Sequence, residues 1–396
     1  MTCLLQRRPM STCMLSFLLL GTPGSKPISY TIGPYKISYD ERSLLVADTR
    51  LTSKIALIEA RQPFVHAAQS ADQITGSSGS WVIHRHDKDV CHGLAAEITQ
   101  HLTDGPVNVS GPFAKPCVGL RWSLIFSRED DDRALNFNLS FHNASSGTSR
   151  HDRLLFSYTR AADERFYGFG QQYTHFDAAG SLVPILAREG GIGRGLEPIS
   201  AFLNAGGREA GGDERTTYSA TPHYITSSLR SLHLTNTEPC WFDLRRRGAV
   251  EVSIMAVRML GRLLGAPSAL ALVEQCTHFT GRMTPLPEWA HAGGVVVGIQ
   301  GGTARVATLT DRLMEAGVPL AGVWLQDWAG ALEQDVLGMR EMRLRWNWRL
   351  DEVLYDGWPS LVANLSSRGV RILTYGASAR PSPLHDPSAC TTSLHH

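Results

Sequence analysis

The sequence lacks an apolar run long enough to cross a membrane, and it carries almost no net charge. Its N-terminal apolar stretch, residues 14–21, falls well short of the roughly 20 residues that a membrane-spanning helix needs. Thirty-eight basic and 37 acidic side chains leave a net charge of +1, so no long-range field attracts a nucleic acid or an anionic membrane. We therefore expect no nucleic-acid partner and no membrane span.

Paired cysteine motifs are also missing. The seven cysteines are scattered, and none belongs to a C-x-x-C pair, which favours neither a disulfide framework nor a zinc site. His84 and His86 share one face of a strand-like stretch, but without a third ligand nearby ordinary surface histidines are the favoured interpretation. The sequence thus predicts mostly buried thiols, with no metal and no cofactor.

Both ends of the chain differ in composition from the rest. Arg7 and Arg8 precede the short apolar stretch, which loosely follows a secretory signal, and four N-x-S/T sequons would be glycosylated on that route. A cytoplasmic location is favoured, with secretion or lysosomal delivery as the alternative. We expect residues 1–27 to form a leader or a disordered segment, and residues 377–396 to form a disordered tail.

Residues 28–286 consist of short β segments separated by turn residues. A hairpin is predicted around Gly33-Pro34, and the charged run 128–133 is interpreted as the tip of a second hairpin because both flanking segments alternate in hydrophobicity. About 260 residues of such strands predict a large antiparallel β-sandwich.

The periodicity changes after Pro287. The predicted order is a strand buried on both faces at 294–299, a helix capped by Thr303 and ended by Gly317, a strand at 321–326, a helix with Pro359 in its first turn that stops at Gly369, and a strand at 370–375. This β-α-β-α-β order over residues 287–376 indicates the opening of a doubly wound sheet or a (β/α)₈ barrel.

The working residues of a (β/α)₈ barrel lie at the C-terminal ends of its strands. The strand at 321–326 ends in the motif Trp324-Leu-Gln-Asp-Trp328, which brings Gln326 and Asp327 to the mouth between two tryptophans. Flat aromatic faces beside polar groups suit a sugar, and the arginines of the following long loop, through 343–349, suit an anionic substituent. The alternative is that the tryptophans pack in the core and the arginines form a solvated loop.

Several motifs resemble glycoside hydrolase family 31. The segments 166–173, 184–186 and 191–195 resemble the N-terminal sandwich signature of that family. The motifs that resemble its sulfoquinovosidase branch are Ala210-Gly-Gly-Asp213, Thr216-Thr-Tyr218, Trp324-Leu-Gln-Asp-Trp328 and Arg343-Leu-Arg-Trp-Asn-Trp348. General α-glucosidases of the family carry an aspartate where Gln326 stands. The resemblance runs from about residue 30 to Tyr375.

This resemblance implies a mutarotase-like antiparallel β-sandwich at 28–286, followed by the first three βα units of a (β/α)₈ TIM barrel at 287–376. It implies a retaining α-glycosidase of carbohydrate metabolism that removes sulfoquinovose, a glucose with a C6 sulfonate. Arg343 and Trp346 match the positions that grip the sulfonate, and Gln326 matches a glutamine that contacts the sugar. The remaining expected site residues are Asp327 and Trp328 in substrate binding, Gln171, Gln172 and Trp324 in support, and Arg340 and Arg345 as alternates to Arg343.

The resemblance assigns neither of the two catalytic carboxylates to a residue of this sequence. A retaining glycosidase needs two carboxyl groups about 5–5.5 Å apart, and in the family both are aspartates on later barrel strands. After Tyr375 the sequence turns into the Pro/Ser/His tail, so we expect an incomplete barrel and a chain that is inactive alone. The alternative is a non-catalytic carbohydrate-binding protein or pseudoenzyme fragment. Either takes a small sugar as partner, and a homo-oligomer is left open.

Overall fold

The computed structural model describes residues 27–375, apart from 52–55, 78–79, 95–96, 116, 118, 144–149, 189–190, 192–196, 206–210 and 337–338. The predicted tail and all but the last residue of the predicted leader lie outside the described residues. The chain divides into two compact units, Met1–Thr280 (unit 1) and Gly281–His396 (unit 2). Among the described residues, no helix is both long and apolar enough to cross a membrane.

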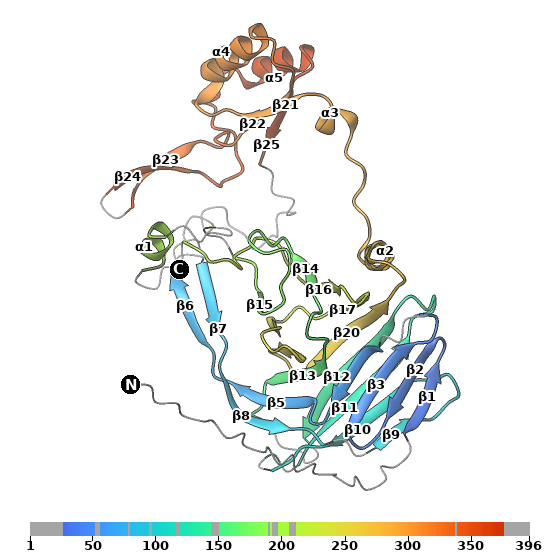
Figure 1. Cartoon of the computed structure of the whole chain (residues 1–396). Coiled ribbons are helices and arrows are strands. Elements are labelled where there is room, and N and C mark those ends of the chain that lie inside the picture. Colours follow the sequence, from blue (N-terminus) through green and yellow to red (C-terminus); the bar gives the residue numbers. More distant parts are fainter. Residues whose placement is uncertain are drawn as a thin grey trace, which may run out of the picture. The chain divides into compact units, whose positions relative to one another are not determined.

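Unit 1 is built from antiparallel sheets (Figure 1). The largest has eight strands, in the order β14 (Phe166–Gly170), β16 (Ala220–Thr226), β17 (Arg230–Leu234), β20 (Arg258–Gly265), β12 (Leu135–Asn143), β11 (Leu120–Arg128), β10 (Val107–Pro112) and β9 (Glu97–Gln100). The second has six, in the order β15 (Leu182–Ile185), β18 (Cys240–Asp243), β19 (Ala249–Ile254), β13 (Arg153–Thr159), β5 (Val65–Ser70) and β8 (Asp87–His92).

Smaller elements complete unit 1. A four-stranded sheet contains β1 (Ile28–Ile32), β2 (Tyr35–Tyr39), β3 (Ser43–Asp48) and β4 (Ala56–Arg61), and β6 (Gln73–Ser77) pairs with β7 (Ser80–His84). The helices are α1 (Ile199–Asn204) and α2 (Ala269–Thr280). Both predicted hairpins are confirmed: β1 pairs with β2 across Gly33, whose φ of +52° suits the turn, and β11 pairs with β12 across the charged tip.

Aromatic side chains from the two large sheets meet in one core. Phe137 of β12 lies 6.3 Å from Phe156 of β13, centroid to centroid, and Phe242 of β18 lies 5.2 Å from Phe169 and 5.7 Å from Tyr224 on the eight-stranded sheet. All five side chains are buried in the same cluster. Alternating residues therefore bury one face of each sheet against the other, as a β-sandwich requires.

The cysteines differ from the sequence-based expectation. Cys91 on β8 and Cys117 in the turn between β10 and β11 form a disulfide, so the prediction of thiols is wrong for this pair. Cys240 and Cys276 are free. The bonded pair is 26 residues apart in sequence, and only the fold brings β8 of one sheet beside the turn of the other.

Unit 2 contains a parallel three-stranded sheet in the order β21 (Val295–Gly298), β22 (Leu320–Leu325) and β25 (Arg371–Thr374). Its helices are α3 (Glu288–His291), α4 (Gly302–Glu315) and α5 (Trp358–Ser367). The predicted β-α-β-α-β order is thus confirmed for these residues. Gly317 and Gly369 follow the two longer helices with φ of +75° and +78°, which is the conformation that a terminating glycine supplies.

Three details of unit 2 correct the sequence interpretation. The strand at 294–299 is not buried on both faces, because β21 is an edge strand whose Val295 is 47% exposed. Helix α4 begins before Thr303, whose hydroxyl donates to the carbonyl oxygen of Asp356 instead of capping the helix. The predicted loop after Gln326 contains a hairpin of β23 (Ala331–Val336) and β24 (Met339–Leu344).

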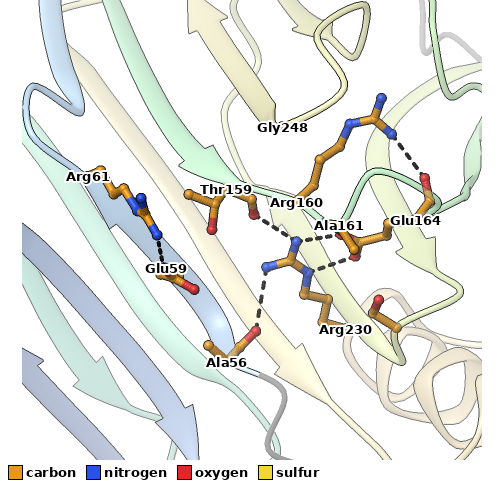
Figure 2. Close-up of a pocket in the computed structure, with 10 residues that line it drawn as sticks. Ala56, Glu59, Arg61, Thr159, Arg160, Ala161, Glu164, Arg230 and Gly248 are labelled. Carbon is orange, nitrogen blue, oxygen red and sulfur yellow. Dashed lines mark hydrogen bonds and ion pairs between the residues drawn. The ribbon is translucent and has the colours of Figure 1, made fainter. Parts of the chain in front are cut away.

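A buried ion pair lies at the edge of the sandwich, beside a cavity of about 600 Å³ (Figure 2). Arg230 donates to both carboxylate oxygens of Glu164, at 2.8 and 2.7 Å, and to the carbonyl oxygen of Thr159 at 2.9 Å. Burial acts to raise the pKa of Glu164, but the hydrogen bonds and charge of Arg230 outweigh it and hold the pKa below its usual value. The pair therefore stays ionised in the fold.

Removing the arginine of this pair is expected to destabilise unit 1. Arg230→Ala leaves the Glu164 carboxylate buried without its counter-charge, which costs about 3–5 kcal/mol of the free energy of unfolding. The matched control is Arg61→Ala, which breaks the exposed Arg61–Glu59 pair at 3.5 Å and is expected to change stability by less than about 0.5 kcal/mol. Urea unfolding measures both, and equal stabilities of the two variants would contradict the prediction.

Candidate functional site

A cavity of about 730 Å³ opens at the C-terminal ends of β21 and β22 in unit 2. This is the end of a parallel sheet at which the loops after the strands gather. The residues that line it are Gly298, Ile299, Gln300, Gly301, Arg305, Leu309, Trp324, Gln326, Asp327, Ala331, Met342, Leu344 and Leu354. Three of the residues predicted from the strand-end motif, Trp324, Gln326 and Asp327, thus lie together on its wall.

Asp327 is buried and holds the segments around the cavity together. Its Oδ2 accepts a hydrogen bond of 2.8 Å from the backbone N–H of Gly301, and its Oδ1 accepts one from the hydroxyl of Tyr355. Burial, together with the hydrogen bond and the charge of Asp327, raises the pKa of Tyr355, so its hydroxyl stays protonated and donates. Both oxygens of this carboxylate are therefore engaged within the fold.

Gln326 is oriented by a neighbour on the adjacent strand end. The Nε2 of Gln300, which follows β21, donates to Oε1 of Gln326 at 2.9 Å. Because Gln326 accepts through its carbonyl oxygen, its NH₂ group is the part that can donate to a ligand hydroxyl. Two amide side chains on neighbouring strands therefore give the cavity a polar wall that suits a sugar.

An aromatic group continues from the wall of the cavity. The ring of Tyr375, directly after β25, lies 5.3 Å from that of Trp324 and 5.1 Å from that of Trp346. Trp346 in turn lies 5.8 Å from Trp348, and the three tryptophans are each about two-fifths exposed, at 38%, 42% and 42%. The tryptophans offer accessible flat faces and indole N–H donors, and Trp324 shares the cavity wall with Gln326.

The structure separates the arginines that the sequence groups together. On β24, Met342 and Leu344 line the cavity, so the period-two alternation of a strand assigns Arg343 between them to the other face of the hairpin. Arg340 pairs with Glu333 at 3.4 Å, and Arg345 lies 3.9 Å from Asp351. Among the described residues, the cation on the cavity wall is Arg305 of α4, which the sequence analysis did not single out.

The remaining predicted residues lie elsewhere in the fold. Trp328 packs against the apolar core of unit 2, and its carbonyl oxygen accepts from the N–H of Asp351 at 3.0 Å. Gln171 and Gln172 follow β14 in unit 1, where Gln172 Nε2 donates to the carbonyl oxygen of Phe169 at 3.1 Å. Tyr173 donates to Oε1 of Gln171 at 3.0 Å. The substrate-binding role of Trp328 and the supporting role of Gln171 and Gln172 stay predictions.

Three further residues of this region were missed by sequence reasoning. Gln300 lies two positions after β21 and Tyr375 directly after β25, so the strand-end rule that identified Gln326 would also have found them. Tyr355 carried no such signal, because it comes from the segment before α5 and meets Asp327 only in the fold. The sequence thus predicts strand ends better than the contacts from the connecting segments.

Comparison with known proteins identifies what the chain resembles. No family model matches it. It is 27% identical over 282 residues to a sulfoquinovosidase of Escherichia coli (strain K12), covering 69% of this chain and 40% of that protein. It is 29% identical over 224 residues to a sulfoquinovosidase of Agrobacterium fabrum (strain C58), covering 57% of this chain and 33% of that protein.

The fold of the chain is also similar to that of a solved structure. A family 31 sulfoquinovosidase from E. rectale, in complex with an aza-sugar inhibitor, superimposes with a TM-score of 0.73 at 22% identity, covering 86% of this chain and 47% of that one. By these comparisons the chain is similar to enzymes of the glycoside hydrolase class. Within that class the chain is similar to the sulfoquinovosidases of family 31, which confirms the resemblance drawn from its motifs. It spans less than half the length of each of these relatives.

Loss of the Asp327 carboxylate is expected to loosen unit 2. Asp327→Ala leaves the Gly301 N–H and the Tyr355 hydroxyl without their acceptor, which costs roughly 2–4 kcal/mol of unfolding free energy, and Tyr355→Phe about half as much. Tryptophan fluorescence during urea unfolding reports on unit 2, because six of the nine tryptophans lie between Trp289 and Trp358.

The matched control is Asp311→Ala on α4. It breaks an ion pair of 2.6 Å with Arg368 in which the aspartate is 52% exposed, and it should change the unfolding midpoint little. An Asp327→Ala variant that unfolds at the same urea concentration as the Asp311→Ala variant would show that the buried carboxylate does not hold the cavity segments together.

Proposed function

We propose that this chain belongs to the substrate-recognition part of a retaining α-glycosidase that acts on α-sulfoquinovosides. The similarity to curated sulfoquinovosidases supports the class of reaction and the sugar. The observation that carries the proposal is the cavity at the strand ends of unit 2, where Gln326, Asp327 and Trp324 of the predicted motif share one wall. A polar amide beside an exposed indole is a suitable surface for a hexose.

The finer architecture forms part of the same proposal. Unit 1 corresponds to a mutarotase-like sandwich, and unit 2 to the first three βα units of a (β/α)₈ barrel. The parallel order β21-β22-β25 with connecting helices α4 and α5 supports this assignment, as does the position of the cavity at the C-terminal strand ends. Further strands would have to complete such a barrel.

Binding of the C6 sulfonate of the sugar requires a cationic side chain. By resemblance, Arg343 and Trp346 hold the C6 sulfonate, and the contact between Trp346 and Tyr375 connects that region with Trp324 on the cavity wall. Arg305 is the competing cation, because it lies on the wall itself. A planar guanidinium fits the oxygens of a sulfonate through paired N–H donors in either case.

Catalysis by this chain alone is not expected. A retaining mechanism needs a nucleophile and an acid/base about 5–5.5 Å apart. Among the described residues of the cavity wall the one acid is Asp327, and both of its oxygens already accept hydrogen bonds. We therefore propose sugar recognition without turnover, which is also the behaviour of the alternative, a non-catalytic carbohydrate-binding protein.

Calorimetry on the full chain tests the proposal. Methyl α-sulfoquinovoside should bind more tightly than methyl α-glucoside, and 4-nitrophenyl α-sulfoquinovoside should release no 4-nitrophenol above a blank. Arg343→Ala should weaken sulfoquinovoside binding roughly 10- to 100-fold, since a charge-assisted hydrogen bond contributes about 1.5–3 kcal/mol, and should leave glucoside binding unchanged.

Four further variants interpret the result. Arg340→Ala and Arg345→Ala test the two alternates, and Arg312→Ala on the exposed face of α4 removes one positive charge away from the cavity wall. Loss of discrimination in Arg305→Ala instead of Arg343→Ala would move the sulfonate site to α4. Equal affinity for both sugars in the unaltered chain would overturn the substrate class, and release of nitrophenol would overturn the absence of turnover.

A further inference from the structure

Three ligand atoms converge where the two large sheets of unit 1 meet. The Nε2 of His151 lies 3.3 Å from Sγ of Cys91 and 3.4 Å from Sγ of Cys117. Cys91 is on β8, Cys117 is in the turn between β10 and β11, and His151 precedes β13. Two sulfurs and one imidazole nitrogen from three separate segments form a set that can hold a metal ion.

Two of the three ligand separations fit a shared ion, and the third, between the two bonded sulfurs, would have to widen to roughly 3.8 Å once the disulfide opens. With zinc at about 2.3 Å from sulfur and about 2.0–2.1 Å from nitrogen, tetrahedral angles separate sulfur and nitrogen ligands by roughly 3.5 Å. The two Sγ–Nε2 distances, 3.3 and 3.4 Å, are within about 0.2 Å of that value. The carbonyl oxygen of Asp89 lies beside the set, 3.0 Å from Nε2 of His151 and 3.2 Å from Sγ of Cys91.

The burial of the two cysteines and the net charge of the ligand set both favour a zinc ion. Cys91 is 1% exposed and Cys117 is 9% exposed, so an uncompensated charge would be costly here. Two thiolates and a neutral imidazole around a divalent cation have no net charge. Sulfur and nitrogen ligands select zinc over calcium or magnesium, which prefer oxygen.

We propose that Cys91, Cys117 and His151 form a zinc site when the two cysteines are in the dithiol state. Each thiol then loses one proton as its sulfur binds Zn²⁺, and His151 binds through the lone pair of Nε2 with its proton on Nδ1, giving up the contact between Nε2 and the Asp89 carbonyl. Binding therefore releases two protons to solvent, and a water completes the four ligands. The disulfide of the structure is the exclusive alternative to the metal-bound state, because a disulfide sulfur is not a thiolate ligand.

The disulfide and the zinc ion would have the same structural effect. The six-stranded sheet supplies β8 and the segment before β13, and the eight-stranded sheet supplies the turn after β10. Either the disulfide or the zinc ion therefore ties the two sheets together at this point. The metal would take over that role wherever the compartment keeps thiols reduced.

Metal analysis of the full chain tests the site. The protein is reduced with a phosphine, which opens the disulfide to two thiols and becomes the phosphine oxide with an oxygen from water. It is then loaded with Zn²⁺ and desalted. We expect one zinc per chain by mass spectrometry, and loss of that zinc in Cys91→Ser and Cys117→Ser. His151→Ala should weaken retention at least about tenfold, because it removes one of three ligands.

Matched variants and a spectrum separate ligation from folding. Cys276→Ser, which removes a free cysteine, and His101→Ala, which removes an exposed histidine, should both retain one zinc. Cobalt(II) in the unaltered reduced chain should give thiolate-to-metal charge-transfer absorption, a readout that does not depend on a variant folding. A disulfide that the phosphine cannot open, a reduced chain that holds no zinc, or equal retention in Cys117→Ser would each overturn the proposal.

Discussion

The hydrogen bonds of the Asp327 carboxylate are the interaction on which the candidate site depends. One oxygen accepts from the loop after β21 and the other from the segment before α5, while the residue itself lies two positions after the end of β22. Because Gly301 and Gly302 have φ of +105° and +85°, the backbone there can turn tightly into α4, and the carboxylate fixes where that turn lies. One buried acid thus fixes the cavity wall, because its two carboxylate oxygens hold Gly301 and Tyr355 in place.

Unit 1 is organised on a different principle. Its stability comes from aromatic faces that two twisted sheets bury against each other, a contact that is strong but not directional. Directional contacts are placed at the margins, where the Arg230–Glu164 ion pair and the Cys91–Cys117 pair fix particular segments. The apolar core therefore makes the sandwich stable, and the polar and covalent contacts determine which loops lie beside one another.

Sequence reasoning succeeded where a pattern is local. Hydrophobic period and terminating glycines predicted β22, α4, α5 and β25, and the two residues chosen by the strand-end rule, Gln326 and Asp327, line the cavity. It failed where the outcome depends on distant segments. Val295 is exposed, against the predicted burial, because β21 lies at the edge of its sheet. The predicted loop after Gln326 contains the β23–β24 hairpin. The Cys91–Cys117 bond joins segments whose cysteine spacing gives no sign of pairing. Arg343 was selected by motif alone, whereas strand alternation assigns it to the face opposite Met342 and Leu344.

The difference between recognising a sugar and hydrolysing it follows from this chemistry. Recognition needs oriented donors and flat apolar faces, and the described cavity has them in Gln326, held by Gln300, and in Trp324. Hydrolysis needs one carboxylate free to attack and one carboxylic acid free to donate. Asp327 is buried and each of its oxygens accepts a hydrogen bond, so releasing it for chemistry would remove contacts that hold the cavity wall. The two hydrogen bonds of Asp327 therefore serve to hold the cavity in shape.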